Sequence, residues 1–189
     1  MALRAPSWAN TQPWELVIVS GARLEAIKQA FVTQRGSKAQ PDFRGPDHFP
    51  ALYKARFKVL AARMTEAAGR AKPDRDSESW YLQGPRLYGA PAAIYILVDR
   101  SLYEQAGGLN VWPVFDCGLV AQNIMLLATH FGLGTIVQAQ AVHYPNVLRQ
   151  MLGLPASKLV LVGIAIGYPD WDNPINQVRS EREAVESVV

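Results

Sequence analysis

The chain has 189 residues, 49% of them hydrophobic and 10% aromatic, which is enough apolar side chain for one compact core. Its formal net charge is only +3 and its basic residues are scattered, so the basic stripe typical of a nucleic-acid-binding protein is missing. The single cysteine, Cys117, excludes an internal disulfide and a paired-cysteine metal or redox site, and it favours a cytoplasmic location. No apolar stretch reaches the roughly 20 residues of a membrane-spanning helix, so no membrane contact is expected.

Eight elements are predicted along the chain from turn residues and from branched, aromatic or helix-forming content. In chain order they are a strand at Trp14–Val19, helices at about Ala22–Thr33 and about Pro50–Ala68, a strand at Ala92–Val98, a helix at Asp116–Phe131, a strand at Thr135–Val137, a helix at about Asn146–Leu152 and a strand at Leu159–Ile166. Several strands are apolar at nearly every position, which indicates a sheet buried on both faces by helices. The pattern therefore predicts an α-β-α sandwich in one domain, residues 1–189.

The helix at Asp116–Phe131 is the most distinctive element, because it is apolar nearly all the way round. Asp116 is predicted to be its N-cap and Gly132 its stop. Gln122 and Asn123 lie within it and are expected to need buried hydrogen-bond partners. Charged residues make up 19% of the chain, below the roughly 25% that is usual. Both features favour a helix at the centre of an obligate dimer.

Two stretches rich in Pro, Gly and charge, residues 36–50 and 69–84, are predicted to be loops on either side of the second helix. Long excursions of this kind often cover a binding site. We therefore expect residues 36–84 to form a lid or substrate-channel region. Residues 170–189 are expected to form a C-terminal tail.

The segment from Arg4 to Trp14 reads RAPSWANTQPW and directly precedes the first buried strand. Its turn-forming and hydrogen-bonding residues are Pro6, Ser7, Asn10, Thr11 and Pro13. A rigid loop of this composition suits a ligand that meets amide and hydroxyl groups. On turn chemistry alone, a turn that merely leads into the strand is an equally good interpretation.

The run A-P-S-x-x-N-x-Q-P-W resembles the signature of the nitroreductase family, and later motifs agree in order and spacing. These are Tyr88-Gly-Ala-Pro-Ala-Ala-Ile-Tyr95, Gly132-Leu-Gly-Thr135 after the long helix, Leu152-Gly-Leu-Pro155, the strand ending Ile164-Ala-Ile-Gly-Tyr-Pro169, and Arg179-Ser-Glu-Arg182. The resemblance covers almost the whole chain. Within the family, RAPSWANTQPWE is most similar to reductases of nitrobenzoate-like compounds.

The resemblance implies an α+β fold with a mostly antiparallel or mixed sheet of about four strands, flanked by helices in an intertwined homodimer. It also implies an FMN-dependent oxidoreductase that passes hydride from NADPH or NADH to a nitroaromatic or quinone-like acceptor. The family pattern assigns flavin contacts to a turn reaching across the dimer and to the stretch after the GLGT motif. The matching residues are Pro6, Ser7, Trp8 and Asn10, and then Val137, Gln138, Ala139 and Gln140.

Two arginines in the tail, Arg179 and Arg182, match the family's terminal basic motif and are expected to hold the FMN phosphate. Without the resemblance, solvated tail charge would be the better interpretation. Tyr53, Arg56 and Trp112 fall in segments that often form the substrate channel in the family. For each of these three taken singly, ordinary packing is favoured.

One part of the family pattern has no counterpart in the quoted motifs. Family members usually begin with a helix of about 30 residues carrying an R-x-S-x-R motif that grips the phosphate. We expect either a truncated sequence or a variant that binds flavin without those arginines. Two alternatives follow: another flavin reaction on this fold, such as dehalogenation or flavin fragmentation, or a dimeric binding protein without cofactor.

Three histidines and the cysteine are not assigned to chemistry. His48, His130 and His143 lack the spacing of a metal site, so no metal is expected. Cys117 lies near the start of a helix, where a thiol can be activated, but a small buried apolar side chain is the favoured interpretation.

Overall fold

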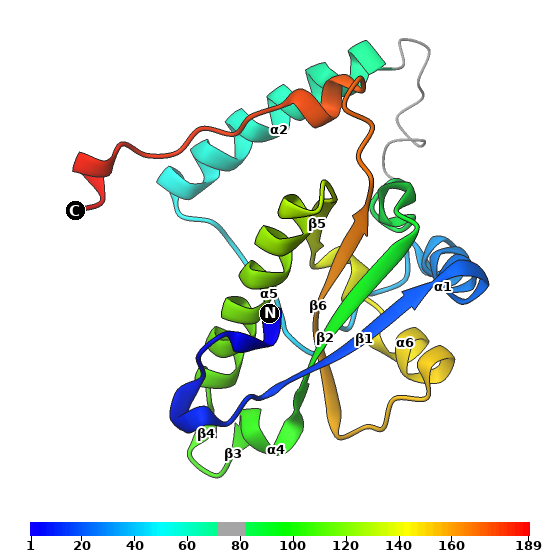
Figure 1. Cartoon of the computed structure of the whole chain (residues 1–189), viewed down its shortest axis with the longest axis vertical. Helices are drawn as coiled ribbons and strands as arrows, with labels where there is room; N and C mark the ends of the chain where they lie inside the picture. Colours follow the sequence, from blue (N-terminus) through cyan, green and yellow to red (C-terminus); the bar gives the residue numbers. More distant parts are fainter. Residues whose placement is uncertain (72–81) are drawn as a thin grey trace. The chain divides into compact units, whose positions relative to one another are not determined.

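The computed structural model describes residues 1–71 and 82–189, so residues 72–81 of the predicted 69–84 loop lie outside the described residues (Figure 1). The chain divides into two compact units. The first unit comprises Met1–Gly45 and Tyr81–Tyr168, and the second comprises Pro46–Trp80 and Pro169–Val189. The predicted excursion and tail fall largely in the second unit. Each unit is described separately.

The first unit is built on a four-stranded sheet in the order β1-β2-β6-β5. Its strands are β1 (Trp14–Ser20), β2 (Ala92–Asp99), β5 (Gly134–Gln138) and β6 (Lys158–Gly167). All three pairings are antiparallel. The predicted number of strands and their positions are confirmed, each to within one or two residues at an end.

Helices cover both faces of this sheet (Figure 1), so the predicted α-β-α sandwich is confirmed. Alternate residues of β2 supply the two cores: Ala93, Tyr95 and Leu97 face one side, and the residues between them face the other. The first side packs against α1 (Gly21–Gln34) and α6 (Pro145–Leu152). The second side packs against α5 (Trp112–His130). Six consecutive positions of β2 are buried, because each face of this central strand meets a helix layer.

An irregularity between β2 and β6 keeps this alternation in step. The register shifts between Ile96, which pairs with Val162, and Leu97, which pairs with Val160. The extra residue of β6 is Leu161, and the shift leaves both Val160 and Ala165 on the α1 and α6 side. Without the bulge, one end of β6 would turn its apolar side chains to the wrong face.

Several short elements complete the first unit. They are the 3-10 turns η1 (Ala2–Arg4), η2 (Trp8–Asn10), η3 (Leu87–Gly89) and η4 (Gln140–Val142), the helix α4 (Arg100–Tyr103), and the hairpin strands β3 (Glu104–Gln105) and β4 (Gly108–Leu109). None was predicted, because elements of two to four residues carry too little periodicity to be detected from sequence.

The unpaired edge of β6 beyond β5 is closed by side chains instead of a strand. The Asp42 carboxylate accepts hydrogen bonds from Val160 N (2.7 Å) and from Arg149 Nη2 (2.6 Å). The same guanidinium nitrogen of Arg149 donates to the Lys158 carbonyl at 3.1 Å. The pair thus satisfies one donor and one acceptor of an open strand edge, as a neighbouring strand would.

The second unit is a long helix with the C-terminal tail lying along it (Figure 1). The helix α2 spans Ala51–Ala71, three residues beyond the predicted end, so the predicted loop at 69–84 begins within it. The tail contains the 3-10 turns η5 (Pro174–Gln177) and η6 (Val185–Ser187). Ion pairs Arg56–Glu183 and Arg63–Glu181 join the tail to α2.

A charge cluster at the Lys158 end of the sheet predicts a pH dependence of stability. Lys158 of β6 pairs with Glu15 of β1 and with Asp99 of β2, the latter at 2.9 Å. Hydrogen bonds from Ser101, followed by that from Lys158, lower the pKa of Asp99 from 3.8 to about 2. Because the folded pKa lies below the usual one, this stabilisation is present above about pH 4 and is lost as the pH falls toward 2.

The variant Asp99→Asn is therefore expected to weaken the decline of unfolding free energy between pH 4 and pH 2. Solvent screens this partly exposed carboxylate, so the difference should be about 1 kcal/mol. Urea unfolding at half-unit pH steps measures it, and Asp47→Asn, which alters an exposed loop carboxylate, is the matched control. An equal decline of unfolding free energy between pH 4 and pH 2 in the two variants would refute the stabilising role of the Asp99 carboxylate.

Candidate functional site

The turn between Pro6 and Pro13 is strained and tied to itself. Three residues other than glycine have a positive φ: Ala9 (48°), Asn10 (58°) and Gln12 (46°). Each such residue costs about 1 to 3 kcal/mol, so the conformation persists only because its surroundings hold it in place. The Ser7 hydroxyl oxygen accepts a hydrogen bond from Gln12 N at 3.0 Å. Since that oxygen is the acceptor, the hydroxyl hydrogen remains free to donate to a ligand.

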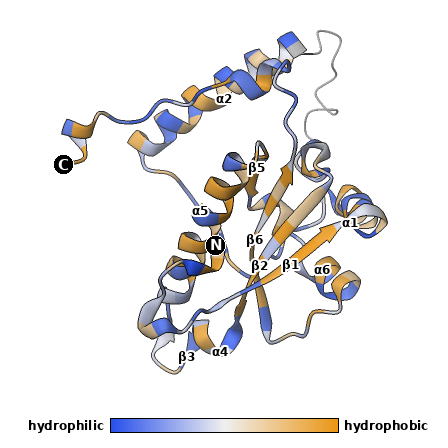
Figure 2. Ribbon diagram, in the orientation of Figure 1, coloured by the Kyte–Doolittle hydropathy of each residue, from blue (hydrophilic) through white to orange (hydrophobic). Residues whose placement is uncertain are grey.

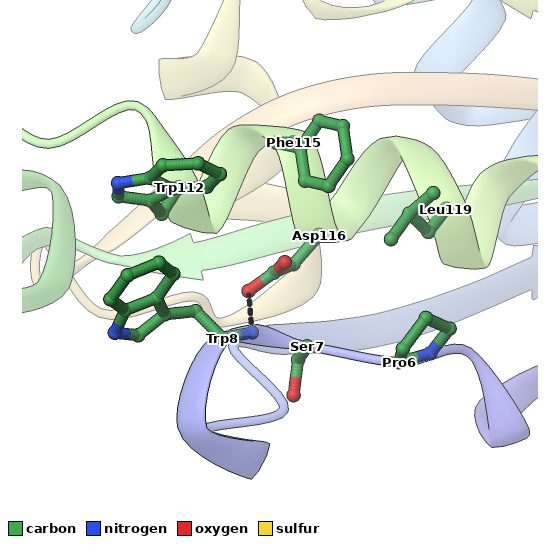
Figure 3. Close-up of a pocket in the computed structure, with 7 residues that line it drawn as sticks. All are labelled: Pro6, Ser7, Trp8, Trp112, Phe115, Asp116 and Leu119. Atoms are coloured by element: carbon green, nitrogen blue, oxygen red, sulfur yellow. Dashed lines mark hydrogen bonds between the residues drawn. The ribbon is translucent and has the colours of Figure 1, made fainter.

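The same turn is attached to the start of α5. Helix α5 begins at Trp112 with Val111 as its N-cap, so the prediction that Asp116 caps the helix is wrong. Pro113, in the first turn, supplies the start signal instead. Asp116 lies inside the helix, is only 2% exposed, and accepts a hydrogen bond from Trp8 N at 3.0 Å (Figure 3).

Two indole rings meet above this hydrogen bond. The rings of Trp8 and Trp112 are stacked, with centroids 4.8 Å apart and an interplanar angle of 30°. Phe115 meets Trp112 edge-on at 5.9 Å. Beside them lies a cavity of about 140 Å³ (Figure 3). It is lined by Pro6, Ser7, Trp8, Trp112, Phe115, Asp116 and Leu119. The structure thus brings together three predicted flavin contacts and one predicted substrate contact, all in the first unit.

Cys117, the neighbour of Asp116, is not a candidate nucleophile. It is buried in the α5 core. Burial first, and the charge of Asp116 second, raise the pKa of its thiol from 9.0 to about 12. A thiol in this setting stays protonated and unreactive at neutral pH, so the interpretation as a small buried apolar side chain is confirmed.

The second predicted flavin segment, residues 137–140, ends β5 and begins η4. Val137, Ala139 and Gln140 are exposed, whereas Gln138 is only 4% exposed. Gln138 pairs in register with Gly163 of β6, which in turn pairs with Tyr95 of β2. Within the described part of the chain, the amide of Gln138 and the hydroxyl of Tyr95 have no hydrogen-bond partner. The sheet therefore has unpaired polar groups on Gln138 and Tyr95, close to the start of η4.

The residues present fit the flat, hydrogen-bonding ring of a cofactor such as FMN. The stacked indoles of Trp8 and Trp112 form an apolar aromatic surface. The Ser7 hydroxyl has its hydrogen available, and the first N–H groups of η4 have no partner within that turn. Fixed main-chain donors of this kind suit the hydrogen-bonding edge of a flavin.

The two segments lie in different places within one chain. The Ser7 turn packs on the first turn of α5, whereas β5 follows the last turn of that helix (Figure 1). A ligand that contacted both the Ser7 turn and residues 137–140, as the family resemblance implies, would contact residues 137–140 of one copy and the Ser7 turn of a second copy.

Helix α5 is rich in hydrophobic residues (Figure 2), and several of those along one face are exposed in the single chain. Phe115, Leu119, Gln122 and Leu126 follow one another at helical spacing, and Phe115 and Leu126 are 57% and 59% exposed. Gln122 lies on this face and is exposed in the single chain, so its expected buried partner remains a prediction. Asn123, one residue on, is half-buried and donates to the Ala2 carbonyl at 3.1 Å.

The remaining predicted residues belong to the second unit. The Arg56 guanidinium lies 5.5 Å from the centre of the Tyr53 ring and forms an ion pair with Glu183 at 2.7 Å. Arg179 donates to the main-chain carbonyl of Asn176, and Arg182 donates to the Ser180 hydroxyl. Both tail arginines are exposed. Their predicted role at a phosphate remains a prediction.

Sequence reasoning missed the anchoring contact of Asp116 and the cavity lining by Phe115 and Leu119. The signal was a single carboxylate inside an otherwise apolar helix, which needs a specific partner. A carboxylate at that position also matches the pattern of a helix N-cap, which is why its contact with the turn was not predicted. Among residues 1–71 and 82–189, no group of three His, Cys, Asp or Glu side chains is placed to hold a metal ion. In that same part of the chain, no helix combines the length and apolarity needed to cross a membrane.

Comparison with known proteins places these features in a family context. The model of the family described as "Nitroreductase family" matches residues 1–168. Nitroreductase NfnB of Mycolicibacterium smegmatis is 31% identical over 185 residues, 96% of this chain and 76% of that protein. A 4-nitrobenzoate reductase of Nocardioides sp. is 28% identical over 196 residues, 98% of this chain and 75% of that protein. The crystal structure of FMN-dependent nitroreductase NfnB from Mycobacterium smegmatis in complex with NADPH aligns with a TM-score of 0.87 at 28% identity, covering 100% of this chain and 82% of that one.

Proposed function

This chain belongs to the nitroreductase family, and we propose that it is an FMN-dependent oxidoreductase that transfers hydride from NAD(P)H to nitroaromatic or quinone-like acceptors. The observation that carries the proposal is the strained Ser7 to Gln12 turn. Its Trp8 stacks on Trp112 and donates a hydrogen bond to Asp116, both in the first turns of α5. The names of the similar proteins support the cofactor, the donor and the aromatic acceptor.

FMN, when bound, would supply the two-electron chemistry of hydride transfer. The residues of this chain bind and orient. Trp8 and Trp112 offer a flat surface for an aromatic ring, and Ser7 offers a hydroxyl hydrogen. The main-chain N–H groups of Ala139 and Gln140 offer donors in fixed positions. In this proposal Arg179 and Arg182 neutralise the phosphate, because guanidinium pairs with phosphate oxygens through two hydrogen bonds.

The proposed assembly is a homodimer with shared sites. The uncovered stripe on α5, from Phe115 to Leu126, provides an apolar surface of the kind that a second copy buries. The separation of the Ser7 turn from residues 137–140 within one chain supports the same arrangement, since each site then needs both copies. The acceptor proposed is a small nitroaromatic, with the aromatic side chains of the cavity as its walls.

The test is a visible spectrum of the purified protein incubated with FMN, followed by anaerobic addition of NADPH. We expect a bound-flavin spectrum that bleaches on addition of NADPH and recovers when 4-nitrobenzoate is added. Steady-state rates with a nitrobenzoate, a quinone and a halophenol then distinguish nitroreduction from dehalogenation. A protein that neither carries nor takes up FMN would refute the proposed function.

A further inference from the structure

The Ser7 to Gln12 turn has few attachments to the body of the first unit. Its internal hydrogen bonds, Gln12 N to the Ser7 hydroxyl and Asn10 N to the Ser7 carbonyl, hold its own shape. They do not fix where the turn lies. Two contacts reach α5: the hydrogen bond from Trp8 N to Asp116 and the stacking of Trp8 on Trp112.

Buried residues flank the turn at Ala5 and Trp14, but between them the stacking contact alone sets its lateral position only loosely. Aromatic pairs tolerate lateral displacement, and Trp8 remains more than half exposed. The hydrogen bond is directional and involves a carboxylate, which makes it stronger than a bond between neutral groups. Asp116 is itself buried, and it comes from a long helix packed on the sheet. Its position is therefore set by the core and not by the turn.

From this geometry we infer that Asp116 is a positioning residue, which fixes the strained Ser7 to Gln12 turn at the flavin site by accepting the Trp8 N–H. The inference rests on the proposed function, because it takes the turn to be part of that site. It assigns to the only carboxylate of α5 the role of holding this turn in place.

The test combines Asp116→Ala with the conservative variant Asp116→Asn, which keeps an oxygen acceptor. In the cofactor-free protein, two signals report the turn: exchange of the Trp8 amide hydrogen and the exciton circular dichroism of the stacked indoles. Asp116→Ala should accelerate the exchange and reduce the exciton signal, and Asp116→Asn should retain most of both. FMN affinity, measured by quenching of flavin fluorescence, should fall about tenfold or more in Asp116→Ala.

Two controls make the readouts specific. Trp112→Phe identifies the exciton signal, since it removes one indole of the pair. Asp42→Ala removes another carboxylate anchor, partly buried at the edge of β6, and should lower the unfolding midpoint while leaving both turn signals unchanged.

The outcomes separate the inference from the proposed function. Unchanged exchange and exciton signals in Asp116→Ala would overturn the anchoring role, whatever the flavin affinity. Loss of those signals with unaltered FMN affinity would overturn the claim that the turn's position controls the flavin site. Absence of FMN binding by the wild-type protein would instead refute the proposed function. That result comes from the FMN titration of the wild type, whereas the anchoring role is tested by amide exchange and circular dichroism without cofactor.

Discussion

Replacing Leu126 with arginine is expected to yield a monomer that no longer retains FMN. Leu126 lies on the exposed apolar stripe of α5, about three turns from Phe115 along the same face. In a twofold dimer each copy contributes this stripe, so one substitution places two like charges in one seam. Burying an unpaired charge costs about 3 kcal/mol or more per copy, which weakens association by roughly 10⁴-fold for the pair.

Light scattering after size-exclusion chromatography measures the mass, and absorbance of the same peak reports the flavin. The matched control is Ala26→Arg, an exposed apolar-to-arginine change on α1, in the helix layer on the opposite side of the sheet. It should leave mass and flavin content as in the wild type. If the Leu126→Arg protein remains dimeric, this face of α5 is not part of the dimer interface. If it is monomeric and still binds FMN, a single chain is sufficient to form the flavin site.

Gly163→Val is expected to lower the free energy of unfolding by about 3 kcal/mol. A Cβ atom at Gly163 would lie 2.7 Å from the Cβ of Ala141 and 3.2 Å from the ring of Tyr95. Both neighbours are buried, and a backbone-attached methyl cannot rotate away, so η4 must shift. Because η4 begins at Gln140, within residues 137–140, we also expect weaker FMN binding.

Urea unfolding monitored by circular dichroism measures the stability change, and fluorescence titration measures the flavin affinity. The double variant Gly163→Val with Ala141→Gly should recover part of the loss, since it removes the nearest clashing atom. Gly107→Ala is the control, because a Cβ there meets nothing within 4 Å and the residue has an ordinary φ. A Gly163→Val protein as stable as the control would show that η4 is not packed on β6 as described.

The candidate site was predictable in its parts and not in its geometry. The turn chemistry of Ser7 and Asn10 and the family resemblance identified the segment. No local pattern indicated that Trp8 would stack on Trp112, about a hundred residues later, or that Asp116 would bond to the turn instead of capping its own helix. Such contacts depend on which helix layer covers which face of the sheet, and that is decided by the whole core.

By itself, the sequence determined the four strands of the main sheet and the three longer helices of the first unit, the burial of β2 on both faces and the inert character of Cys117, because these follow from local composition and periodicity. Only the tertiary structure decided the strand order, the bulge that keeps β6 in step, the closing of its edge by Asp42 and Arg149, and the anchoring of the turn. Each of these features joins residues far apart in the chain. The packing and hydrogen bonds that stabilise them form only when the helix layers pack on the sheet, so local sequence patterns do not predict them.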